Sequence, residues 1–289
     1  MSYLNELKEL CDNLECKFIP DCGLKEYTTF KFGGPCRALI SINSTKSVSA
    51  IVRFLKEKKL KFRVIGRGSN IIVSDEGYDG IVLFFGHDFA YTVLSGSMIE
   101  CEAGTLLASA CVLAQQNGFT GMENLFGIPG TLGGALYMNA GAYGSEISDI
   151  AHSAEYVDGS GEVHTIELKK SDFSYRKSIF TDSDKIITGV TLSLEKGNSD
   201  EIRERMTECM AKRTAKQPLE YPSAGSTFKR PEGYFAGKLI QDCGLKGFRV
   251  GDAVVSEKHS GFVINAGQAT AADVMALIRY VQQEAEEKF

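Results

Sequence analysis

The sequence lacks an excess of basic residues and any long apolar run, and each gap excludes a class of protein. The formal net charge is −5 at pH 7, whereas binding to a nucleic-acid backbone or an anionic membrane surface needs a broad basic face. No apolar run approaches the roughly 20 residues of a membrane-spanning helix, and the N-terminal segment MSYLNELKELCDNLECKF is an amphipathic, acid-containing helix pattern rather than a signal peptide. We therefore expect a cytoplasmic protein with no nucleic-acid or membrane partner, which must meet any anionic ligand locally.

The sequence also lacks the residue spacings typical of metal sites, and it has few prolines. The eight cysteines form no CxxC pair and no Cys/His metal spacing, and His152, His164 and His259 are scattered, so we expect reduced thiols and no bound metal. Thirty glycines stand against only six prolines. The glycines cluster between Gly66 and Gly144, which indicates backbone pressed close to a ligand rather than disorder.

The order of apolar patterns predicts an α+β protein of two or three modest domains. RALISI predicts a strand, KSVSAIVRFLKEKKL a helix capped by Ser44 or Thr45, and Phe62 to Ile65 another strand. The expected elements that follow are short strands from Ile81, a helix in GTLLASACVLAQQNGF that Gly118 can end, a hairpin in SAEYVDGSGEVHTIEL, and a strand in KIITGVTLSLEKG. The charged helix after Asn198 predicts the start of a separate domain, and a capping-box pattern at Thr270 predicts a last helix.

The segment VIGRGSNIIVSD, residues 64–75, combines a glycine turn with a following apolar run. Gly66 and Gly68 allow a tight turn whose N–H groups can point at an anion, with Ser69 and Asn70 as further donors. The apolar run at 71–73 reads as a strand, however, whereas a phosphate cradle usually opens a helix. The loop is therefore either half of a phosphate site or a plain connection between strands.

A second segment, FGIPGTLGGALYMNAGAYG, is crowded with small residues. Pro129, Gly130 and Thr131 precede an apolar stretch, which predicts a helix whose first N–H groups and dipole would favour a diphosphate. The alternative is close packing of a helix through its glycines. Two such loops in two β-rich halves suggest one ligand clamped between them.

Two further segments carry charge beside small or aromatic residues. Ser226 in YPSAGSTFKRP is followed by Lys229 and Arg230, which form either a solvated basic turn or part of a site; no Gly-x-Ser-x-Gly elbow supports a hydrolase. Arg176 in FSYRKSIF is either a packed surface residue or a clamp for a carboxylate.

Taken together, these segments resemble one family. TTFKFGGP, GRGSNIIVSDEGYDGIV, GMENLFGIPGTLGGALYMNAGAYGSEISD, YRKS, PSAGSTFKRP, AGKLIQDCGLKG and VSEKHSGFVINAGQATAADV occur in the order typical of the UDP-N-acetylenolpyruvoylglucosamine reductases, flavoenzymes of bacterial cell-wall synthesis. The resemblance runs from about Tyr27 to Val274. It implies a two-subdomain FAD-binding fold of the PCMH or vanillyl-alcohol-oxidase type over residues 1–198, with a subdomain boundary near 78, and a C-terminal α+β substrate-binding domain over 199–289.

The resemblance also assigns the loops to FAD. The implied cofactor-binding residues are Gly66, Arg67, Gly68, Ser69, Asn70, Ile71, Ile128, Pro129, Gly130, Thr131, Gly133, Gly134, Asn139, Ala140, Gly141 and Ala142. Relatives that tether flavin covalently can carry a histidine after the glycine turn, where this chain has Ser69. Non-covalent FAD is therefore expected.

The implied chemistry is reduction of an enolpyruvyl sugar nucleotide through FAD, with NADPH as donor, by a monomeric enzyme. Arg176 would stabilise the developing enolate and Ser226 would protonate C2, while Tyr175, Lys229 and Arg230 would contact the substrate. The family often has asparagine where this chain has Arg230. No tyrosine-bearing insertion lies between Ser178 and Pro218, which indicates the shorter, second type.

One departure leaves other functions open. The family pattern continues past the last helix with a short strand whose glutamate completes the site, whereas this sequence ends at EAEEKF. We expect a missing last strand or an impaired reduction step. The alternatives are a flavin-binding module without catalysis and another PCMH-type oxidoreductase acting on a small alcohol, which would not need the YRKS and PSAGSTFKRP segments.

Overall fold

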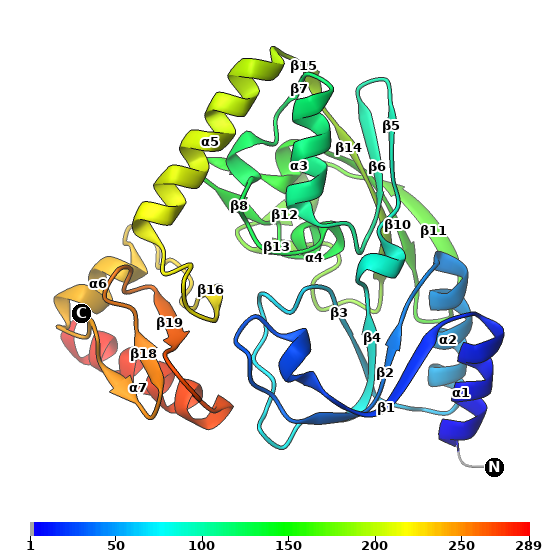
Figure 1. The fold of residues 1–289 in the computed structure, drawn as a ribbon, viewed down its shortest axis with the longest axis horizontal. Helices are drawn as coiled ribbons and strands as arrows, with labels where there is room; N and C mark the ends of the chain where they lie inside the picture. Colours follow the sequence, from blue (N-terminus) through cyan, green and yellow to red (C-terminus); the bar gives the residue numbers. More distant parts are fainter. Residues whose placement is uncertain (1–2) are drawn as a thin grey trace. The chain divides into compact units, whose positions relative to one another are not determined.

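The computed structural model describes residues 3–289, which form three main sheets and seven α-helices within that range (Figure 1). The first sheet has the order β1-β2-β4-β3: β1 (Lys17–Gly23), β2 (Pro35–Ser41), β4 (Tyr78–Phe84) and β3 (Phe62–Ile65). The second has the order β11-β10-β14-β6-β5: β11 (Val163–Glu167), β10 (Ala151–Val157), β14 (Ile186–Ser193), β6 (Met98–Glu102) and β5 (Thr92–Ser95). The third has the order β16-β19-β18-β17: β16 (Ser223–Ser226), β19 (Phe262–Asn265), β18 (Ala253–Val255) and β17 (Arg249–Val250).

Helices and short β-pairs complete the chain. The helices are α1 (Tyr3–Asn13), α2 (Thr45–Glu57), α3 (Leu107–Gln116), α4 (Leu132–Tyr137), α5 (Ser199–Lys216), α6 (Ala236–Asp242) and α7 (Ala271–Lys288). The two-stranded pairs are β7 (Phe119–Thr120) with β15 (Glu195–Lys196), β8 (Gly141–Ala142) with β9 (Ser145–Glu146), and β12 (Phe173–Ser174) with β13 (Lys177–Ser178). Among the described helices, none is long and apolar enough to cross a membrane.

Several predicted elements are confirmed, together with the local signals that predicted them. Ser44 caps α2 by accepting a hydrogen bond from the N–H of Ser47 at 3.2 Å, and Val48, Ile51 and Val52 form its buried face. The hairpin of β10 and β11 pairs Val157 with Val163 across the predicted turn. The N-terminal helix is α1, with residues 1 and 2 outside the described part of the chain.

The predicted strand at residues 71–73 is wrong. This segment is assigned to no strand, and the next strand, β4, begins at Tyr78. Its neighbour Ser74 accepts hydrogen bonds from the N–H groups of Gly34, at 2.8 Å, and Gly77, at 2.9 Å. Ile72 packs at the edge of an apolar core that also contains Phe30 and Phe32. The apolar run is therefore extended chain held by loops and core packing rather than by a strand ladder.

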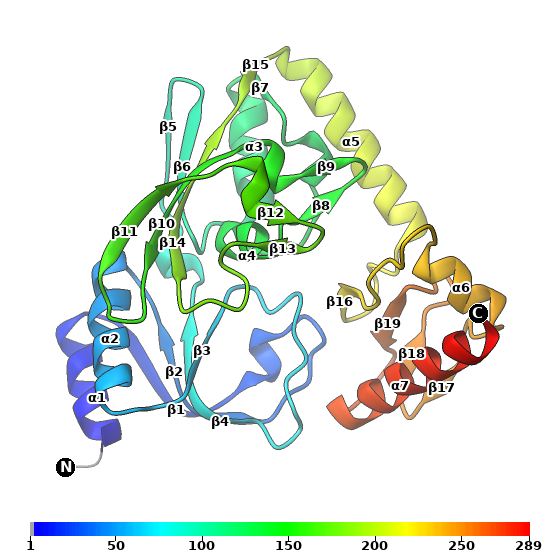
Figure 2. The same ribbon diagram turned by 180° about the vertical axis from the view of Figure 1, so that it is seen from behind.

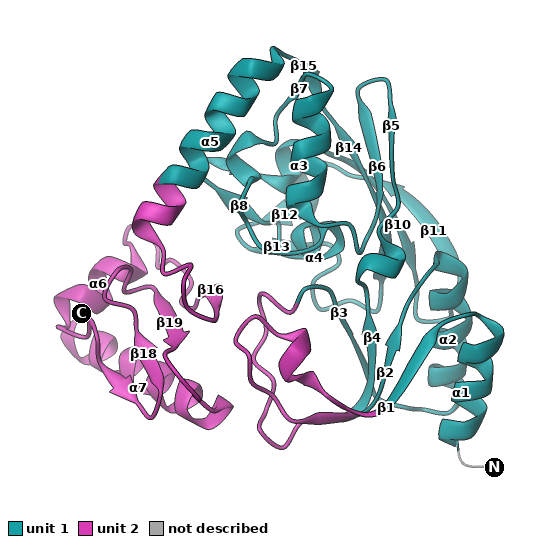
Figure 3. Cartoon of the chain, viewed as in Figure 1, with its two compact units in different colours: residues 1–20, 37–67, 80–211 teal, residues 21–36, 68–79, 212–289 magenta. Residues whose placement is uncertain are grey.

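The chain divides into two compact units, and each unit is built from three separate stretches of the sequence (Figure 3). The first comprises residues 1–20, 37–67 and 80–211, and the second residues 21–36, 68–79 and 212–289. In the first unit, α3 and α4 pack on the five-stranded sheet, as Figure 2 shows from behind. In the second unit, α7 packs on β17 and β18. The domain boundary that we predict at 198/199 divides the sequence at a single point, whereas these units are defined by packing and combine distant segments. The boundary therefore stays a prediction.

An ion pair between a buried carboxylate and a half-exposed arginine anchors the N-terminal part of α5 in the first unit. The carboxylate of Glu123, only 8% exposed, lies 2.7 Å from Nη2 of Arg205 and accepts hydrogen bonds from Thr120 Oγ1 and the N–H of Gly121. Burial raises the pKa of this carboxyl, but the hydrogen bonds from Thr120 and Arg205 outweigh that effect, and the pKa lies below its ordinary value. Glu123 therefore stays ionised at neutral pH and holds α5 against the sheet-bearing part of the unit.

Candidate active site

The glycine loop begins directly after β3 and touches the second small-residue segment. A Cβ atom added to Gly66 would lie 2.4 Å from Oγ1 of Thr131, so no larger residue fits there without displacing Thr131. Gly66 and Thr131 both belong to the first unit. The structure thus brings together the two loops that the sequence singled out, at one point of direct contact.

The rest of the glycine loop belongs to the second unit, which contains Gly68, Ser69, Asn70 and Ile71. The carbonyl oxygen of Gly68 accepts hydrogen bonds from the N–H of Thr29 at 3.2 Å and from its hydroxyl at 3.3 Å. The loop is therefore pinned to the TTFKFGGP segment, a contact between residues 39 positions apart that the sequence did not indicate.

The predicted helix after Gly130 is α4, with Thr131 as its N-cap, but most of the helix's first N–H groups are already occupied. Thr131 Oγ1 accepts a hydrogen bond from Gly134, while the N–H groups of Leu132 and Gly133 donate to the carbonyl oxygens of Thr105 and Ala103 at 2.8 and 2.9 Å. The expectation that the first turn of α4 offers free donors to a diphosphate is wrong for these three residues, because the neighbouring chain satisfies them.

Gly133 itself serves packing. A Cβ added there would lie 2.8 Å from Cβ of Ala103, so the helix approaches the end of β6 as closely as its backbone allows. The packing alternative considered for this segment is therefore correct at Gly133. The preceding turn is different: within residues 3–289, no hydrogen bond uses the N–H of Gly130, Thr131 or Gly66. They are among the donors that the loops can offer to an anion, together with the N–H groups of Arg67, Gly68 and Asn70, which also make no hydrogen bond within that range.

The third part of the predicted site surrounds Arg176 in the turn between β12 and β13. Its Nη2 donates to the carbonyl oxygen of Gly141 at 2.9 Å and its Nη1 to that of Asn139 at 3.3 Å. The guanidinium carbon lies 4.9 Å from the ring centroid of Tyr175. Arg176 has a φ of +58°, a left-handed conformation that is uncommon for a residue with a side chain. The turn therefore holds this arginine in a defined position against the 139–142 segment.

Asn139 organises the same cluster, and Glu146 joins it although the sequence did not single it out. Asn139 is 1% exposed and donates from Nδ2 to Oε2 of Glu146, at 2.9 Å, and to the carbonyl oxygen of Ser174, at 3.1 Å. Its Oδ1 accepts from the N–H of Ser148. Oε1 of Glu146 lies 3.8 Å from Nη1 of Arg176. The only sign of this hydrogen-bond network in the sequence was a polar residue inside a run of glycine and alanine. That sign indicated Asn139 but not Glu146.

Ser226 lies at the end of β16 in the second unit and is exposed. It pairs with Phe262 across a register irregularity between Ser223 and Ser226, and its neighbour Thr227 donates from its N–H to the carbonyl oxygen of Gly261 at 2.8 Å. A bulge of this kind redirects a side chain out of the strand pattern. The serine hydroxyl is thus presented on a backbone that the neighbouring strand fixes.

Exposed charged and aromatic side chains follow Ser226. Lys229 and Arg230 are both exposed, and the guanidinium carbon of Arg230 lies 4.4 Å from the ring centroid of Phe235. Phe235 and Tyr234 are 64% and 60% exposed, an aromatic pair that the sequence analysis did not assign. Burial lowers the pKa of His259, whose Nδ1 accepts a hydrogen bond from the N–H of Gly261. His259 is therefore neutral at physiological pH and serves the turn as an acceptor.

The donor set fits a bound diphosphate. Gly66 contacts Thr131, Gly130 directly precedes Thr131, and among the described residues the N–H groups of all three make no hydrogen bond. Backbone N–H groups in glycine turns are typical ligands of phosphate oxygens. Among the described residues, no group of His, Cys, Asp and Glu is arranged to hold a metal ion.

Comparisons with known proteins show the class of protein to which the chain belongs. An FAD-binding domain family model matches residues 36–167, and a model of the C-terminal domain of UDP-N-acetylenolpyruvoylglucosamine reductase matches residues 217–289. A solved structure of alkyldihydroxyacetonephosphate synthase, 18% identical, shares the fold over 67% of this chain and 41% of its own, with a TM-score of 0.50. The α+β, PCMH-type FAD-binding architecture with a separate C-terminal domain is confirmed, and the chain is a flavoprotein oxidoreductase.

The family follows from closer relatives. The UDP-N-acetylenolpyruvoylglucosamine reductase of Clostridium novyi is 46% identical over 92% of this chain and 86% of its own. The crystal structure of the enzyme of that name from Thermus caldophilus is 37% identical, covers 93% of this chain and 95% of its own, and superposes with a TM-score of 0.80. The chain belongs to the UDP-N-acetylenolpyruvoylglucosamine reductase family, as the resemblance predicted.

Proposed function

We propose that this protein reduces UDP-N-acetylglucosamine enolpyruvate to UDP-N-acetylmuramate, with FAD as cofactor and NADPH as electron donor, in the synthesis of cell-wall precursors. The observation that carries the proposal is the cluster around Arg176, in which two carbonyl oxygens, Glu146 and the ring of Tyr175 fix a guanidinium beside residues 139–142. A flavin-binding module without catalysis has no need for an arginine held in this way.

FAD is proposed to lie along the two loops that meet at Gly66 and Thr131. The N–H groups of Gly66, Gly130 and Thr131 would bind its diphosphate, with Arg67, Gly68, Ser69, Asn70 and Ile71 on one side. Ile128, Pro129, Gly134 and residues 139–142 would line the other side, while Gly133 serves packing. Ser69 offers no nucleophile of the kind that tethers a flavin, so binding would be non-covalent.

FAD, when bound, supplies the acceptor for hydride from NADPH and the donor of hydride to the substrate. The protein's part is to stabilise the negative charge that develops on the enolpyruvyl group. Arg176 has five N–H donors and spends two of them on Gly141 and Asn139, which leaves donors for the substrate carboxylate. A fixed guanidinium stabilises charge as it appears, without having to reorganise during the reaction.

Ser226 is proposed to deliver the proton to C2 of the substrate. A hydroxyl is a weak acid, so it can act only on a strongly basic carbon and near polarising cations. Lys229 and Arg230 follow it within four residues and would contact the sugar nucleotide, as would Tyr175. The proton that Ser226 loses would return from solvent, to which the residue is exposed.

An anaerobic titration tests the proposed function. We expect the purified protein to be yellow, to bleach on addition of NADPH, and to regain the oxidised flavin spectrum when the enolpyruvyl sugar nucleotide is added. A colourless protein that takes up no FAD would contradict both the reductase and the alternative small-alcohol oxidoreductase. A protein that bleaches with NADPH but is not reoxidised by the substrate would instead favour the module without catalysis.

Replacement of Gly66 by alanine is expected to lower FAD affinity at least about tenfold, because the added Cβ would lie 2.4 Å from Thr131 Oγ1 and push the two loops apart. The measurement is a titration of the apoprotein with FAD, followed by flavin fluorescence. Gly23→Ala is the matched control, since a Cβ at Gly23 meets nothing within 4 Å. Equal FAD affinity of the Gly66→Ala and Gly23→Ala proteins would remove Gly66 from the cofactor site.

The cytoplasmic location and the monomeric state remain our proposals from the sequence. Burial raises the pKa of Cys101 to about 11 and that of Cys111 to about 12. These thiols are protonated at neutral pH and therefore unreactive, which suits an enzyme of a reducing compartment.

A further inference from the structure

Helix α7 packs on the sheet of the C-terminal domain, and its own capping residues do not bind all of the N–H groups at its N-terminus. Its first four N–H groups need acceptors, as in any helix. The capping box of Thr270 and Asp273 satisfies two of them: the N–H of Thr270 donates to Oδ2 of Asp273 at 3.0 Å, and the N–H of Asp273 donates to Oγ1 of Thr270 at 3.1 Å. The N–H groups of Ala271 and Ala272 are left over, and a residue from a distant part of the chain binds both.

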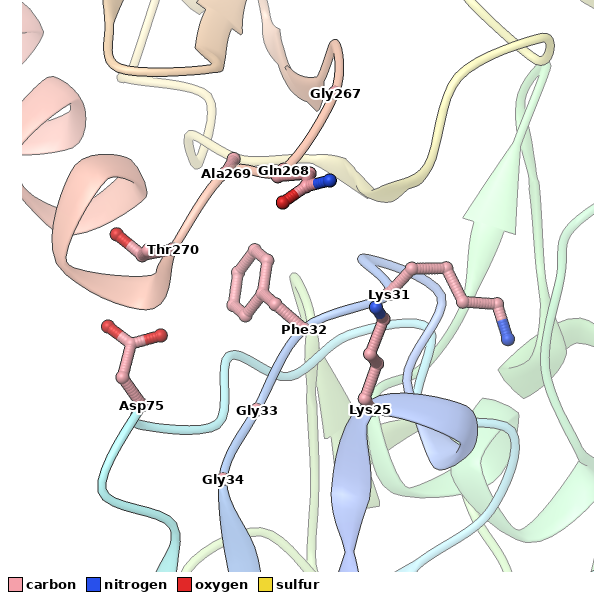
Figure 4. Close-up of a pocket in the computed structure, with 10 residues that line it drawn as sticks. All are labelled: Lys25, Lys31, Phe32, Gly33, Gly34, Asp75, Gly267, Gln268, Ala269 and Thr270. Atoms are coloured by element: carbon pink, nitrogen blue, oxygen red, sulfur yellow. The ribbon is translucent and has the colours of Figure 1, made fainter.

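That residue is Asp75, the last residue of the VIGRGSNIIVSD segment. Its Oδ1 accepts from the N–H of Ala271 at 2.8 Å and its Oδ2 from the N–H of Ala272 at 2.9 Å, although 196 and 197 positions separate the partners. In Figure 4 the carboxylate of Asp75 faces Thr270 at the start of the helix, beside a cavity of about 290 Å³ that Phe32, Gln268 and Lys25 also line. A carboxylate at the positive end of a helix dipole is favourably placed.

The position of Asp75 is fixed from its other side. The N–H of Gly34 donates to the carbonyl oxygen of Ser74 at 2.8 Å, and a Cβ on Gly34 would lie 2.3 Å from the carbonyl oxygen of Asp75. Phe30 and Phe32 enter the same apolar core as Val274 and Leu277 of α7, and Asn265 Nδ2 donates to the carbonyl oxygen of Phe30. The glycine loop, the TTFKFGGP segment and α7 are therefore one packed assembly inside the second unit.

We propose that Asp75 is a positioning residue that couples the FAD loop to the substrate-binding segment. The inference rests on the proposed function, in which Gly68 to Ile71 bind FAD and Ser226, Lys229 and Arg230 meet the substrate. FAD bound to the loop restrains Asp75 four residues further on, and the two hydrogen bonds of Asp75 favour the observed arrangement of α7 on the sheet that carries Ser226. Loss of these bonds lowers the population of that arrangement and so weakens substrate binding in proportion.

Replacement of Asp75 by alanine is expected to raise KM for the enolpyruvyl substrate about fivefold, the change that corresponds to loss of a typical helix N-cap, with kcat within twofold. Asp75→Asn keeps one acceptor oxygen and should fall between the wild type and the alanine variant. Hydrogen exchange gives a readout independent of activity: FAD should slow exchange at the amides of Ala271 and Ala272 in the wild type and leave it unchanged in Asp75→Ala.

Asp252→Ala is the matched control. Asp252 also accepts from a backbone N–H just before α7, that of Gln268 at 2.9 Å, and pairs with Arg249, but all of these partners lie in the C-terminal domain. If Asp252→Ala and Asp75→Ala raise KM equally, Asp75 acts only through the stability of that domain, and the coupling is refuted. Unchanged exchange at Ala271 and Ala272 in FAD-loaded wild type would refute it as well. A wild type that binds no FAD would overturn the proposed function instead, so the two failures are distinct.

Discussion

Ser226→Ala is expected to leave reduction of the flavin by NADPH intact and to slow its reoxidation by the enolpyruvyl substrate by about a thousandfold, a typical effect of removing a general acid. The reason is that the hydroxyl is proposed to supply only the proton at C2 and to take no part in the step between NADPH and FAD. Single-turnover absorbance measurements under anaerobic conditions separate the two half-reactions. A residual rate should persist, because water can protonate a strongly basic carbon.

Two further variants make the test specific to the hydroxyl. Ser223→Ala removes a hydroxyl from the same strand, β16, at a position that pairs with Ile264, and should leave both half-reactions unchanged. Ser226→Cys places a thiol there, whose pKa near 8.5 makes it a stronger acid than the hydroxyl, and should recover part of the lost rate. Reoxidation of Ser226→Ala at the wild-type rate would remove this serine from the mechanism.

Elements whose signals are local could be predicted from the sequence. The cap of α2 at Ser44, the hairpin turn between β10 and β11, and the start of α4 after the Pro129-Gly130-Thr131 loop each depend on residues within four positions of one another. The candidate site residues could be proposed from the sequence, because glycine-rich loops and an arginine among aromatics are unusual in composition, and their roles stay predictions. The family resemblance then gave these positions their roles.

What could not be predicted depends on distant contacts. The apolar run at 71–73 suggested a strand, but its neighbour Ser74 bonds to Gly34 and Gly77 instead of a ladder partner. The N–H groups at the start of α4 suggested an anion site, yet carbonyl oxygens of Ala103 and Thr105 already occupy two of them. Asp75 and α7 are joined across 196 positions. In each case the hydrogen-bond partner that determines the structure is too distant in the sequence for periodicity or capping patterns to indicate it.

Arg176→Ala should slow flavin reoxidation by the substrate by about a thousandfold, the upper range for loss of one charge-stabilising donor group. Arg176→Lys should still lose about a hundredfold, because an ammonium cannot donate to the carbonyl oxygens of Asn139 and Gly141 and also present a planar pair of N–H groups to a carboxylate. Anaerobic reoxidation rates at saturating substrate, with the rate of reduction by NADPH as internal reference, measure both losses.

The backbone conformation of the turn at Arg176 makes the three proteins directly comparable. The left-handed conformation at position 176, with φ of +58°, is equally demanding for arginine, lysine and alanine, so the backbone contributes little to differences among the three proteins. Lys177→Ala is the control: it removes a positive charge from the next residue, which is exposed in β13, and should change reoxidation less than twofold. A comparable loss in Lys177→Ala would mean that the total positive charge of the turn matters. Loss confined to position 176 would mean that the fork held by Asn139 and Gly141 stabilises the substrate carboxylate.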